Sequence, residues 1–212
     1  MIALDTVGSN VDDFGCPNCN CHDRERHLVL YLRALDLFAK FRGAAILHFA
    51  PEHQLSKLID NLGPAIYIKG DLYPTSDSIQ TIDMLAIDYP SGSFDFVIAN
   101  HVLEHVDDDA LALAELRRVL KIGGFAILQT PFSNRLTKTF SDPGIDSDSA
   151  RYQAYGQEDH VRLYGKDIFG RIESAGFKSW VSMHQDKLVD FDSQTHGVNI
   201  EEPLFLFERV GP

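Results

Sequence analysis

The chain has 212 residues, enough for one globular domain with a sizeable core, and 44% of them are hydrophobic and 24% charged, as in ordinary globular proteins. Its net charge is −12, and its short basic stretches are mixed with acids, which argues against a nucleic-acid partner. No apolar run reaches the roughly 18 residues of a membrane span, and the first residues lack the features of a secretory signal. We therefore expect a cytoplasmic protein that binds a small molecule, with no membrane or nucleic-acid partner.

Three cysteines lie together near the start, in GCPNCNCHDRERH. An odd number in a chain expected in the cytoplasm argues against a disulfide framework. Cys16 and Cys19 have the spacing of half a zinc knuckle, which Cys21, His22 or His27 would have to complete. No second CxxC follows, and closed zinc sites usually combine two separated pairs, so the sequence favours thiols without a metal.

Hydrophobic periodicity divides the rest of the chain into helices and strands. In chain order, we expect a helix over 24–41, a strand over 44–49, a helix over 53–63, strands over 65–72, 78–85 and 93–100, a helix over 107–124, a strand over 125–132, a helix over 166–176, and strands over 178–184 and 203–210. Residues 1–23 are expected to be irregular. The polar segment 133–159 is too long for a routine connection and is expected to cover a site.

Apolar strands separated by amphipathic helices indicate βαβ units. The fold class predicted is α/β: a Rossmann-like, doubly wound, seven-stranded, mostly parallel sheet with helices on both faces and the last strand pair antiparallel. Residues 1–43 would form an N-terminal cover segment and helix, and residues 44–212 the main domain. Ligands of such sheets bind beyond the carboxyl ends of the strands, which directs attention to the loops there.

Two strand ends carry groups suited to a nucleoside. Asp71 ends the second strand, where a carboxylate can accept both hydroxyls of a ribose. Asp83 and Met84 end the third strand, where a carboxylate, a backbone N–H and an apolar side chain can hold an adenine ring. A single Asp at a strand end is equally typical of a turn or a helix cap, so the spacing has to decide.

The stretch DMLAIDYPSGSFDFVIANHVLEHV resembles a segment of the class I S-adenosylmethionine-dependent methyltransferases, especially the methyltransferase type 11 group. Asp83 stands twelve residues before Asp95, as in that group, and Tyr89-Pro90 replaces its leucine-proline step, one position displaced. ALAELRRVLKIGGFAILQTPF and HVRLYGKDIFGRIESAGF are similar to later segments of the group, with Ile122 in place of a proline. The resemblance covers roughly residues 44–180.

This resemblance implies S-adenosylmethionine as the cofactor and methyl transfer to a small-molecule or sugar acceptor as the activity. By position, it gives Asp71 to the ribose and the segment after Ile82 to adenine. The cofactor-binding residues expected are His48, Phe49, Ala50, Pro51, Glu52, Asp71, Leu72, Asp83, Met84, Leu85, Asn100 and His101. Residues 44–212 would then be the S-adenosylmethionine-binding methyltransferase domain.

The loop after the first strand departs from the family, because it reads HFAPE where the family has GxGxG. Pro51 removes a backbone donor and Glu52 adds a negative charge, both unfavourable for the pyrophosphate of NAD or FAD. S-adenosylmethionine has no phosphate and carries a sulfonium and an ammonium, which Glu52 would attract. Arg24 or Arg26 would partner its carboxylate.

A hydroxyl or amine acceptor benefits from a general base poised near neutrality, which histidine supplies. His101, His105 and His160 are the candidates, and we predict catalytic roles for His160 and His101. His160 is favoured because it follows the long polar segment. Arg162 beside it would hold an anionic part of the acceptor.

Two alternative functions remain open from the sequence. The chain would be a non-catalytic binding module if it kept this fold but not the cofactor. It would be a zinc hydrolase if His101, Glu104 and His105, which fit H-x-x-E-H, lay within one long helix. The motif directly follows a predicted strand, which argues against that helix.

Overall fold

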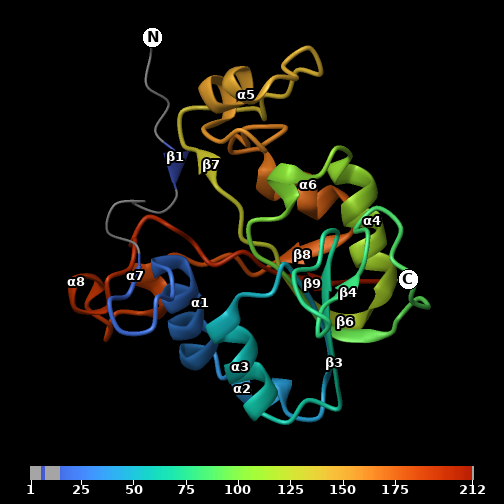
Figure 1. Ribbon diagram of the computed structural model, residues 1–212. Helices are drawn as coiled ribbons and strands as arrows, with labels where there is room; N and C mark the ends of the chain where they lie inside the picture. Colours follow the sequence, from blue (N-terminus) through green and yellow to red (C-terminus); the bar gives the residue numbers. More distant parts are fainter. Residues whose placement is uncertain (1–5, 8–14, 212) are drawn as a thin grey trace.

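The central feature of the computed structural model, which describes residues 6–7 and 15–211, is a seven-stranded sheet in the order β4-β3-β2-β5-β6-β9-β8 (Figure 1). The strands are β2 (Ala45–Phe49), β3 (Ile66–Asp71), β4 (Gln80–Thr81), β5 (Phe94–Ala99), β6 (Leu120–Ile127), β8 (Phe177–Ser179) and β9 (Leu206–Arg209). Neighbours from β4 to β6 are parallel, whereas β9 is antiparallel to both β6 and β8. The predicted fold class is confirmed, including the antiparallel pair at the end of the chain.

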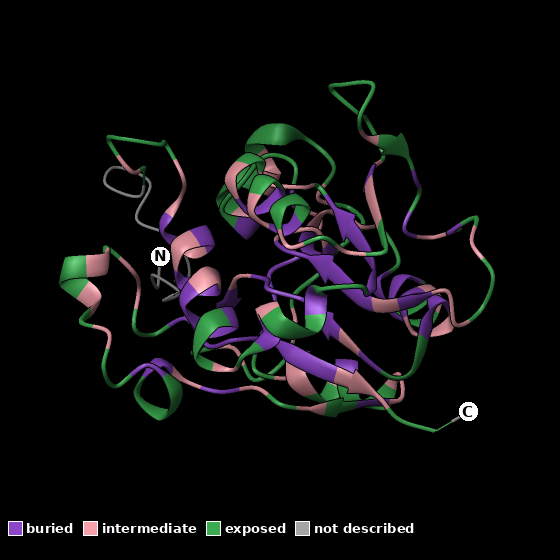
Figure 2. Ribbon diagram, turned by 90° about the horizontal axis from the view of Figure 1, so that it is seen from below, coloured by how far each residue is buried: buried purple, intermediate pink, exposed green. Residues whose placement is uncertain are grey.

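Helices cover both faces of this sheet because its central strands are apolar on both sides. On one face lie α1 (Asp23–Ala34), α2 (Leu37–Phe41) and α3 (His53–Asn61), and on the other lie α4 (Asp109–Val119) and α6 (Ile168–Ser174). In β2, Ile46 packs into the cluster with α1 to α3, and the next residue, Leu47, packs into the cluster with α4 and α6. The buried strands run between exposed helical surfaces in Figure 2.

Short elements fill the connections. They are β1 (Thr6–Val7), which pairs antiparallel with β7 (Phe132–Ser133), the 3₁₀ turn η1 (Leu103–His105), α5 (Asp148–Tyr155), α7 (His184–Lys187) and α8 (Ser193–His196). The prediction of an irregular start is wrong at Thr6–Val7, and for residues 1–5 and 8–14 it lies outside the described part of the chain. In that described part, no helix is long and apolar enough to cross a membrane.

Element boundaries differ from the sequence prediction where single residues leave regular geometry. The expected helix over 24–41 is two helices, because Asp36 adopts a left-handed conformation with φ of 52°. The expected strand over 78–85 shortens to Gln80–Thr81, which leaves Asp83, Met84 and Leu85 in the turn that follows.

The helix expected over 107–124 ends at Val119, and β6 begins directly after it. Leu120 pairs with Phe94, and the next paired residue, Phe125, lies opposite Phe96, so residues 121–124 bulge out of the sheet. Gly124 fits there because a Cβ would lie 2.9 Å from the backbone oxygen of Asp95. Gly123, with φ of 78°, and Gly124 therefore belong to this bulge rather than to a helix end.

Candidate active site

A cavity of about 690 Å³ opens at the carboxyl ends of β2, β3, β4 and β5. This is where the ligands of doubly wound sheets bind, and the volume suits a small organic molecule. Its walls are formed by Phe49, Ala50, Asp71, Leu72, Tyr73, Ile82, Asp83, Met84, Leu85, His101, Val102, His105, Val106, Asp107 and Asp159.

Most of the predicted cofactor residues lie on these walls. They are Phe49, Ala50, Asp71, Leu72, Asp83, Met84, Leu85 and His101. The other predicted residues, His48, Pro51, Glu52, Asn100 and His160, are not among the residues lining the cavity. Sequence reasoning did not assign Tyr73, Ile82, Val102, Val106, Asp107 or Asp159 to the site. Tyr73, Ile82 and Val102 directly follow or precede assigned residues, and Asp159 ends the segment 133–159, which was expected to cover a site.

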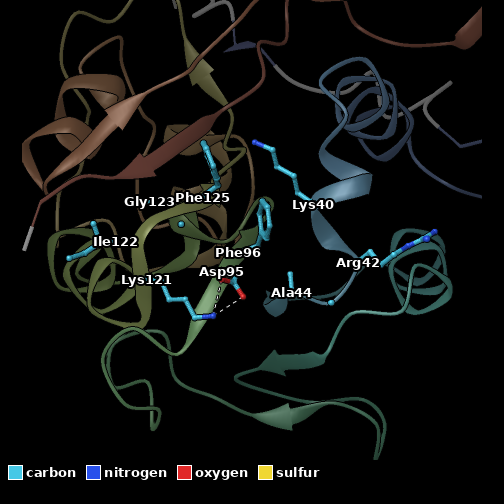
Figure 3. Close-up of a pocket in the computed structure, with 11 residues that line it drawn as sticks. Lys40, Arg42, Ala44, Asp95, Phe96, Lys121, Ile122, Gly123 and Phe125 are labelled. Atoms are coloured by element: carbon cyan, nitrogen blue, oxygen red, sulfur yellow. Dashed lines mark hydrogen bonds and ion pairs between the residues drawn. The ribbon is translucent and has the colours of Figure 1, made fainter.

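A second cavity, of about 380 Å³, lies at the opposite, amino ends of β2 and β5 (Figure 3). Asp95 there accepts hydrogen bonds from the Ala45 backbone N–H (2.8 Å) and from Lys121 Nζ (2.8 and 2.9 Å). Burial would raise the pKa of Asp95, but these donors outweigh it and lower the pKa. Asp95, part of the family-like motif, therefore joins the starts of two strands and lies far from the ligand end of the sheet.

The loop after β2 turns without glycine because Ala50 itself adopts the left-handed conformation, with φ of 44°. Its backbone N–H donates to the Gly70 carbonyl oxygen at 2.9 Å, which fixes the turn against β3. The loop thus keeps the backbone conformation that glycine favours while using a residue with a Cβ.

A chain of polar side chains supports this loop from behind. The buried ring of His48 contacts the Tyr67 hydroxyl through Nδ1 (2.8 Å) and Glu52 through Nε2 (2.9 Å). The other oxygen of Glu52 accepts a hydrogen bond from Asn100 Nδ2 at 3.0 Å. Burial would raise the pKa of Glu52, but the bonds from His48 and Asn100 outweigh it and lower the pKa. Three predicted ligand residues thus hold the loop in place beneath the cavity.

Asp71 and Asp83 share one local geometry at the cavity wall. The Oδ1 atom of each accepts a hydrogen bond at 2.8 Å from the backbone N–H two residues later, Tyr73 and Leu85 respectively. These Asx turns orient both carboxylates, and neither turn requires the second carboxylate oxygen. Between them, the backbone N–H of Ile82 donates to the Asp71 carbonyl oxygen at 2.9 Å and brings the two strand ends together.

His101 lies at the end of β5 in a left-handed conformation, with φ of 53°. Its Nδ1 lies 3.3 Å from Glu104 and its Nε2 lies 3.8 Å from Glu202, too far for a hydrogen bond. Burial favours the neutral ring, but the two carboxylates outweigh it and raise the pKa of His101 to about 9. The raised pKa favours the imidazolium form of His101 at neutral pH, and this form has no lone pair with which to accept a proton.

The H-x-x-E-H pattern does not form the helix that a zinc hydrolase requires. Leu103–His105 is a single 3₁₀ turn, and Glu104 pairs with His101 and accepts a hydrogen bond from Thr130 Oγ1 at 2.9 Å. Among the described residues, the group there whose ligand atoms lie within 4.8 Å of one another is Glu104, His105 and His160, without His101. The two histidines of the pattern therefore do not face one metal position.

His105 and His160 lie next to each other at the edge of the cavity, with ring centroids 4.7 Å apart. His105 lines the cavity, and its Nδ1 lies 3.2 Å from the backbone oxygen and 3.3 Å from the carboxylate of Asp159. His160 is buried behind it, where Nδ1 donates to the Tyr155 carbonyl oxygen (3.3 Å) and burial lowers its pKa. Of the histidines considered, His105 thus combines access to the cavity with a carboxylate partner.

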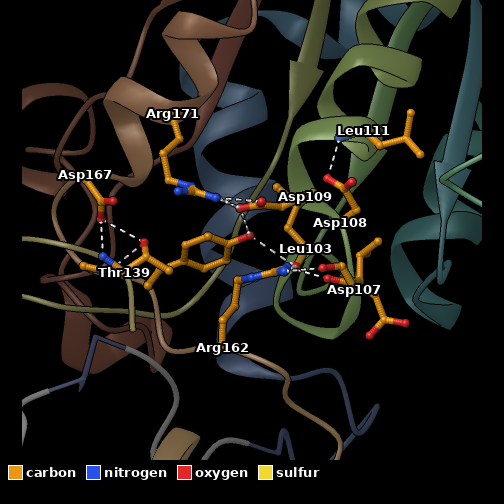
Figure 4. Close-up of polar contacts among 12 residues, drawn as sticks. Leu103, Asp107, Asp108, Asp109, Leu111, Thr139, Arg162, Asp167 and Arg171 are labelled. Carbon is orange, nitrogen blue, oxygen red and sulfur yellow. Dashed lines mark hydrogen bonds and ion pairs between the residues drawn. The ribbon is translucent and has the colours of Figure 1, made fainter. Parts of the chain in front are cut away.

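Arg162 does not face an acceptor, contrary to the sequence-based expectation. Its buried guanidinium donates to the backbone oxygens of Leu103 (2.9 Å), Val106 (2.5 Å) and Asp107 (2.8 Å) (Figure 4). Burial of this long cation is tolerated because the carbonyl groups of the turn saturate it. Arg162 therefore holds the turn after β5 in place.

Of the two arginines proposed for a carboxylate, Arg26 is already occupied. Its guanidinium donates to the backbone oxygens of Cys21 (2.7 Å), His196 (3.0 Å) and Gly197 (2.6 Å). Among the residues that the structure describes, Arg24 Nε is buried without a hydrogen-bond partner, and the charge of Arg24 acts on His101. Arg24 is therefore the arginine with donor capacity near the end of β5.

Comparisons with known proteins agree with this geometry. A family model described as "Methyltransferase domain" matches residues 56–128. An uncharacterized 37.1 kDa protein in transposon TN4556 of Streptomyces fradiae is 40% identical over 97 residues, which are 45% of this chain and 27% of that protein. The chain thus spans about a quarter of the length of that relative.

Solved structures share the fold at low sequence identity. The YcgJ protein from Bacillus subtilis has a TM-score of 0.55 at 15% identity, covering 88% of this chain and 100% of its own. A putative methyltransferase from Bacillus halodurans has a TM-score of 0.55 at 14% identity, with coverages of 85% and 99%. An S-adenosylmethionine-dependent methyltransferase from Mesorhizobium loti has a TM-score of 0.54 at 12% identity, with coverages of 84% and 96%.

The matched segment contains Asp71, Asp83 and the turn after β5. Residues 56–128 are therefore similar to a methyltransferase domain, and the whole chain shares its fold with these solved structures.

Proposed function

We propose that this protein transfers the methyl group of S-adenosylmethionine to a small-molecule or sugar acceptor. The observation that carries the proposal is the convergence of Asp71, Asp83 and the Phe49–Ala50 turn on one cavity of about 690 Å³. In this proposal residues 44–212 form the cofactor-binding domain, and the preceding segment covers it.

The polar groups around the cavity suit each part of this cofactor. Asp71 would accept the ribose hydroxyls, and Asp83 with the buried Met84 would hold the adenine. Arg24 and the protonated His101 supply positive charge for the carboxylate of the methionine part. Ionised Glu52 behind the loop contributes negative charge near the sulfonium and ammonium, whereas it would repel a pyrophosphate.

S-adenosylmethionine supplies an electrophilic methyl group, so the protein has to align the acceptor and remove a proton from it. We assign the proton to His105 Nε2, because Nδ1 of this ring faces the carboxylate of Asp159. An Nδ1–H bond to that carboxylate leaves the Nε2 lone pair available at the cavity wall. We therefore propose His105 as the base, in place of the His160 and His101 predicted from the sequence.

The wall formed by Val106, Asp107 and Asp159 lies beside His105 and is the proposed acceptor side. Two carboxylates there, in a chain of net charge −12, disfavour polyanionic acceptors such as nucleic acid. A neutral or cationic small molecule or a sugar fits this charge.

Calorimetric titration with S-adenosylmethionine and with its demethylated product tests the cofactor proposal. We expect micromolar binding to the wild-type protein and loss of binding of at least tenfold in Asp71→Ala and Asp83→Ala. Asp88→Ala is the matched control, because Asp88 is an exposed acid five positions after Asp83 and does not line the cavity. Absence of binding by folded wild-type protein would refute the proposal and favour a binding module of the same fold.

The tautomer of His105 tests the assignment of the base without a known acceptor. Nitrogen-15 NMR should show the neutral imidazole of His105 in the Nδ1–H form, with the resonance assigned by its absence in His105→Gln. Asp159→Asn should shift that equilibrium because it removes the carboxylate partner. A dominant Nε2–H form in the wild type would rule out His105 as the base.

A further inference from the structure

The three cysteines near the start of the chain converge on one point, although no part of the proposed methyl transfer uses them. Their sulfur atoms all lie within 4.8 Å of one another, and Sγ of Cys19 lies 3.2 Å from Sγ of Cys21. All three are free thiols, and they are all the cysteines in the chain. The close approach of three free thiols that form no disulfide requires a physical explanation.

The backbone of the loop directs the sulfurs toward each other. The Cys16 N–H donates to the Cys21 carbonyl oxygen at 2.9 Å, and the Asn20 N–H donates to the Cys16 carbonyl oxygen at 2.8 Å. Asn20 adopts the left-handed conformation, with φ of 58°, which turns Cys21 back toward the CxxC pair. The backbone N–H groups of Asn18 and Cys19 point at the Cys16 sulfur.

We propose that Cys16, Cys19 and Cys21 bind one zinc ion through three thiolates, with water in the fourth position. Tetrahedral coordination with Zn–S bonds of about 2.3 Å places sulfurs roughly 3.8 Å apart, which the observed cluster matches after small side-chain rotations. Three soft thiolate ligands favour zinc over magnesium or calcium. In the described part of the chain, no histidine or carboxylate completes this group, and Cys19 is exposed, so the fourth position faces solvent.

A metal ion bound in the cysteine loop would affect the elements that the loop contacts. The loop leads directly into α1, and Gln54 Nε2 of α3 donates to the Cys19 carbonyl oxygen at 3.0 Å. Arg26 joins the Cys21 carbonyl oxygen to the backbone at His196 and Gly197. A bound ion would therefore fix the start of α1, the helix that carries Arg24. This inference stands independently of the proposed methyl transfer.

Metal content of the full-length protein, purified in reducing buffer without chelator, tests the proposal. Mass spectrometry of the elements should find one zinc per chain, with copper and iron far below stoichiometry. Replacement by cobalt should give tetrahedral d–d bands together with thiolate-to-cobalt charge transfer. Substoichiometric metal in protein produced with added zinc, or copper or iron in its place, would overturn the proposal.

Variants of the cysteine loop distinguish a metal-binding site from cysteines that lie together by chance. Cys21→Ser should lower bound zinc at least tenfold in a chelator competition, whereas Asn18→Ser, in the same loop, should retain it. Thiol titration of the wild-type protein should count three reactive thiols only after a chelator removes the metal, which needs no variant and does not depend on folding of Cys21→Ser. Three freely reactive thiols before chelation, or a Cys19–Cys21 disulfide detected by loss of two hydrogens in the intact mass, would contradict the site.

Discussion

Ala50 shows how the loop after β2 functions without glycine. It is one of four non-glycine residues with positive φ in the described chain, together with Asn20, Asp36 and His101, and both Ala50 and His101 lie at the cavity. Left-handed geometry costs an L-residue about 1–2 kcal/mol, and such strain is concentrated at functional sites. The support from His48, Glu52 and Asn100 beneath the loop offsets this cost.

Substitution of Ala50 tests whether its left-handed conformation is strained. We expect Ala50→Gly to raise the free energy of unfolding by up to about 1 kcal/mol, because relief of strain exceeds the added chain entropy. Ala50→Val should lower it by about 2 kcal/mol and weaken S-adenosylmethionine binding, since a β-branched residue fits this φ poorly. Urea denaturation and calorimetry measure both effects.

The control is the same substitution in a helix. Ala114 is exposed in the middle of α4, so Ala114→Gly should destabilise the protein by about 1 kcal/mol. Equal destabilisation by Ala50→Gly and Ala114→Gly would show that the loop at Ala50 is unstrained.

The turn after β5 depends on a distant segment. Arg162 donates to three carbonyl groups of residues 103–107, and Val106 and Asp107 of the same turn line the cavity. Beside it, Asp109 at the start of α4 is held by Arg171 (2.6 Å) and by the Tyr164 hydroxyl (3.1 Å) (Figure 4). Arg162 therefore supports the cavity wall through the backbone of this turn.

Arg162→Met should lower the free energy of unfolding by about 3 kcal/mol, because three carbonyl groups lose a charged, buried donor. It should also weaken S-adenosylmethionine binding, since the turn at the cavity wall loosens. Arg33→Met is the matched control, because Arg33 is exposed on α1 and the change should stay within about 0.5 kcal/mol. Equal denaturation midpoints for the two variants would contradict a holding role for Arg162.

Across the whole molecule, a buried charge cluster connects the end of β5 to the segment before β9. His101 lies between Glu104 and Glu202, and Gln129 Nε2 donates to Glu202 at 3.3 Å from the end of β6. Burial would raise the pKa of both carboxyls, but His101 outweighs it and lowers both. Stability should therefore depend on pH through this cluster.

The direction of this pH dependence follows from the pKa values of the three groups in the folded protein. The pKa of His101 is raised from 6.5 to about 9, so its contribution to stability is complete below pH 6.5 and is lost as pH rises through 9. The carboxyls have lowered pKa values, so their contribution is lost only as pH falls below their usual range. Between pH 6 and 10 the wild type should lose about 2–3 kcal/mol more than His101→Gln, measured by urea denaturation at each pH. Parallel curves for the two proteins would show that His101 is not charged in the folded state.

Much of the architecture followed from local patterns. Apolar periodicity predicted the parallel strands and the helices between them, because burial on both faces requires continuous apolar runs. The antiparallel pair was predicted because no helix-length connector of clear periodicity separates the last two strands. The rule that ligands bind at carboxyl ends then selected Asp71, Asp83 and their neighbours, which do line the cavity. Boundaries failed where one backbone conformation decides them, as at Asp36 and at the bulge before Phe125.

The sequence by itself determined the order of elements and which strand ends meet, since both follow from chain connectivity and side-chain period. It did not determine the partners of Glu52, His101 or Arg162, because each partner lies on another segment and competes with solvent or a ligand for the same charge. Only the tertiary structure decided that Glu52 supports the loop, that two carboxylates keep His101 protonated, and that backbone carbonyls saturate Arg162. Burial makes such pairings obligatory, and burial is a property of the folded chain.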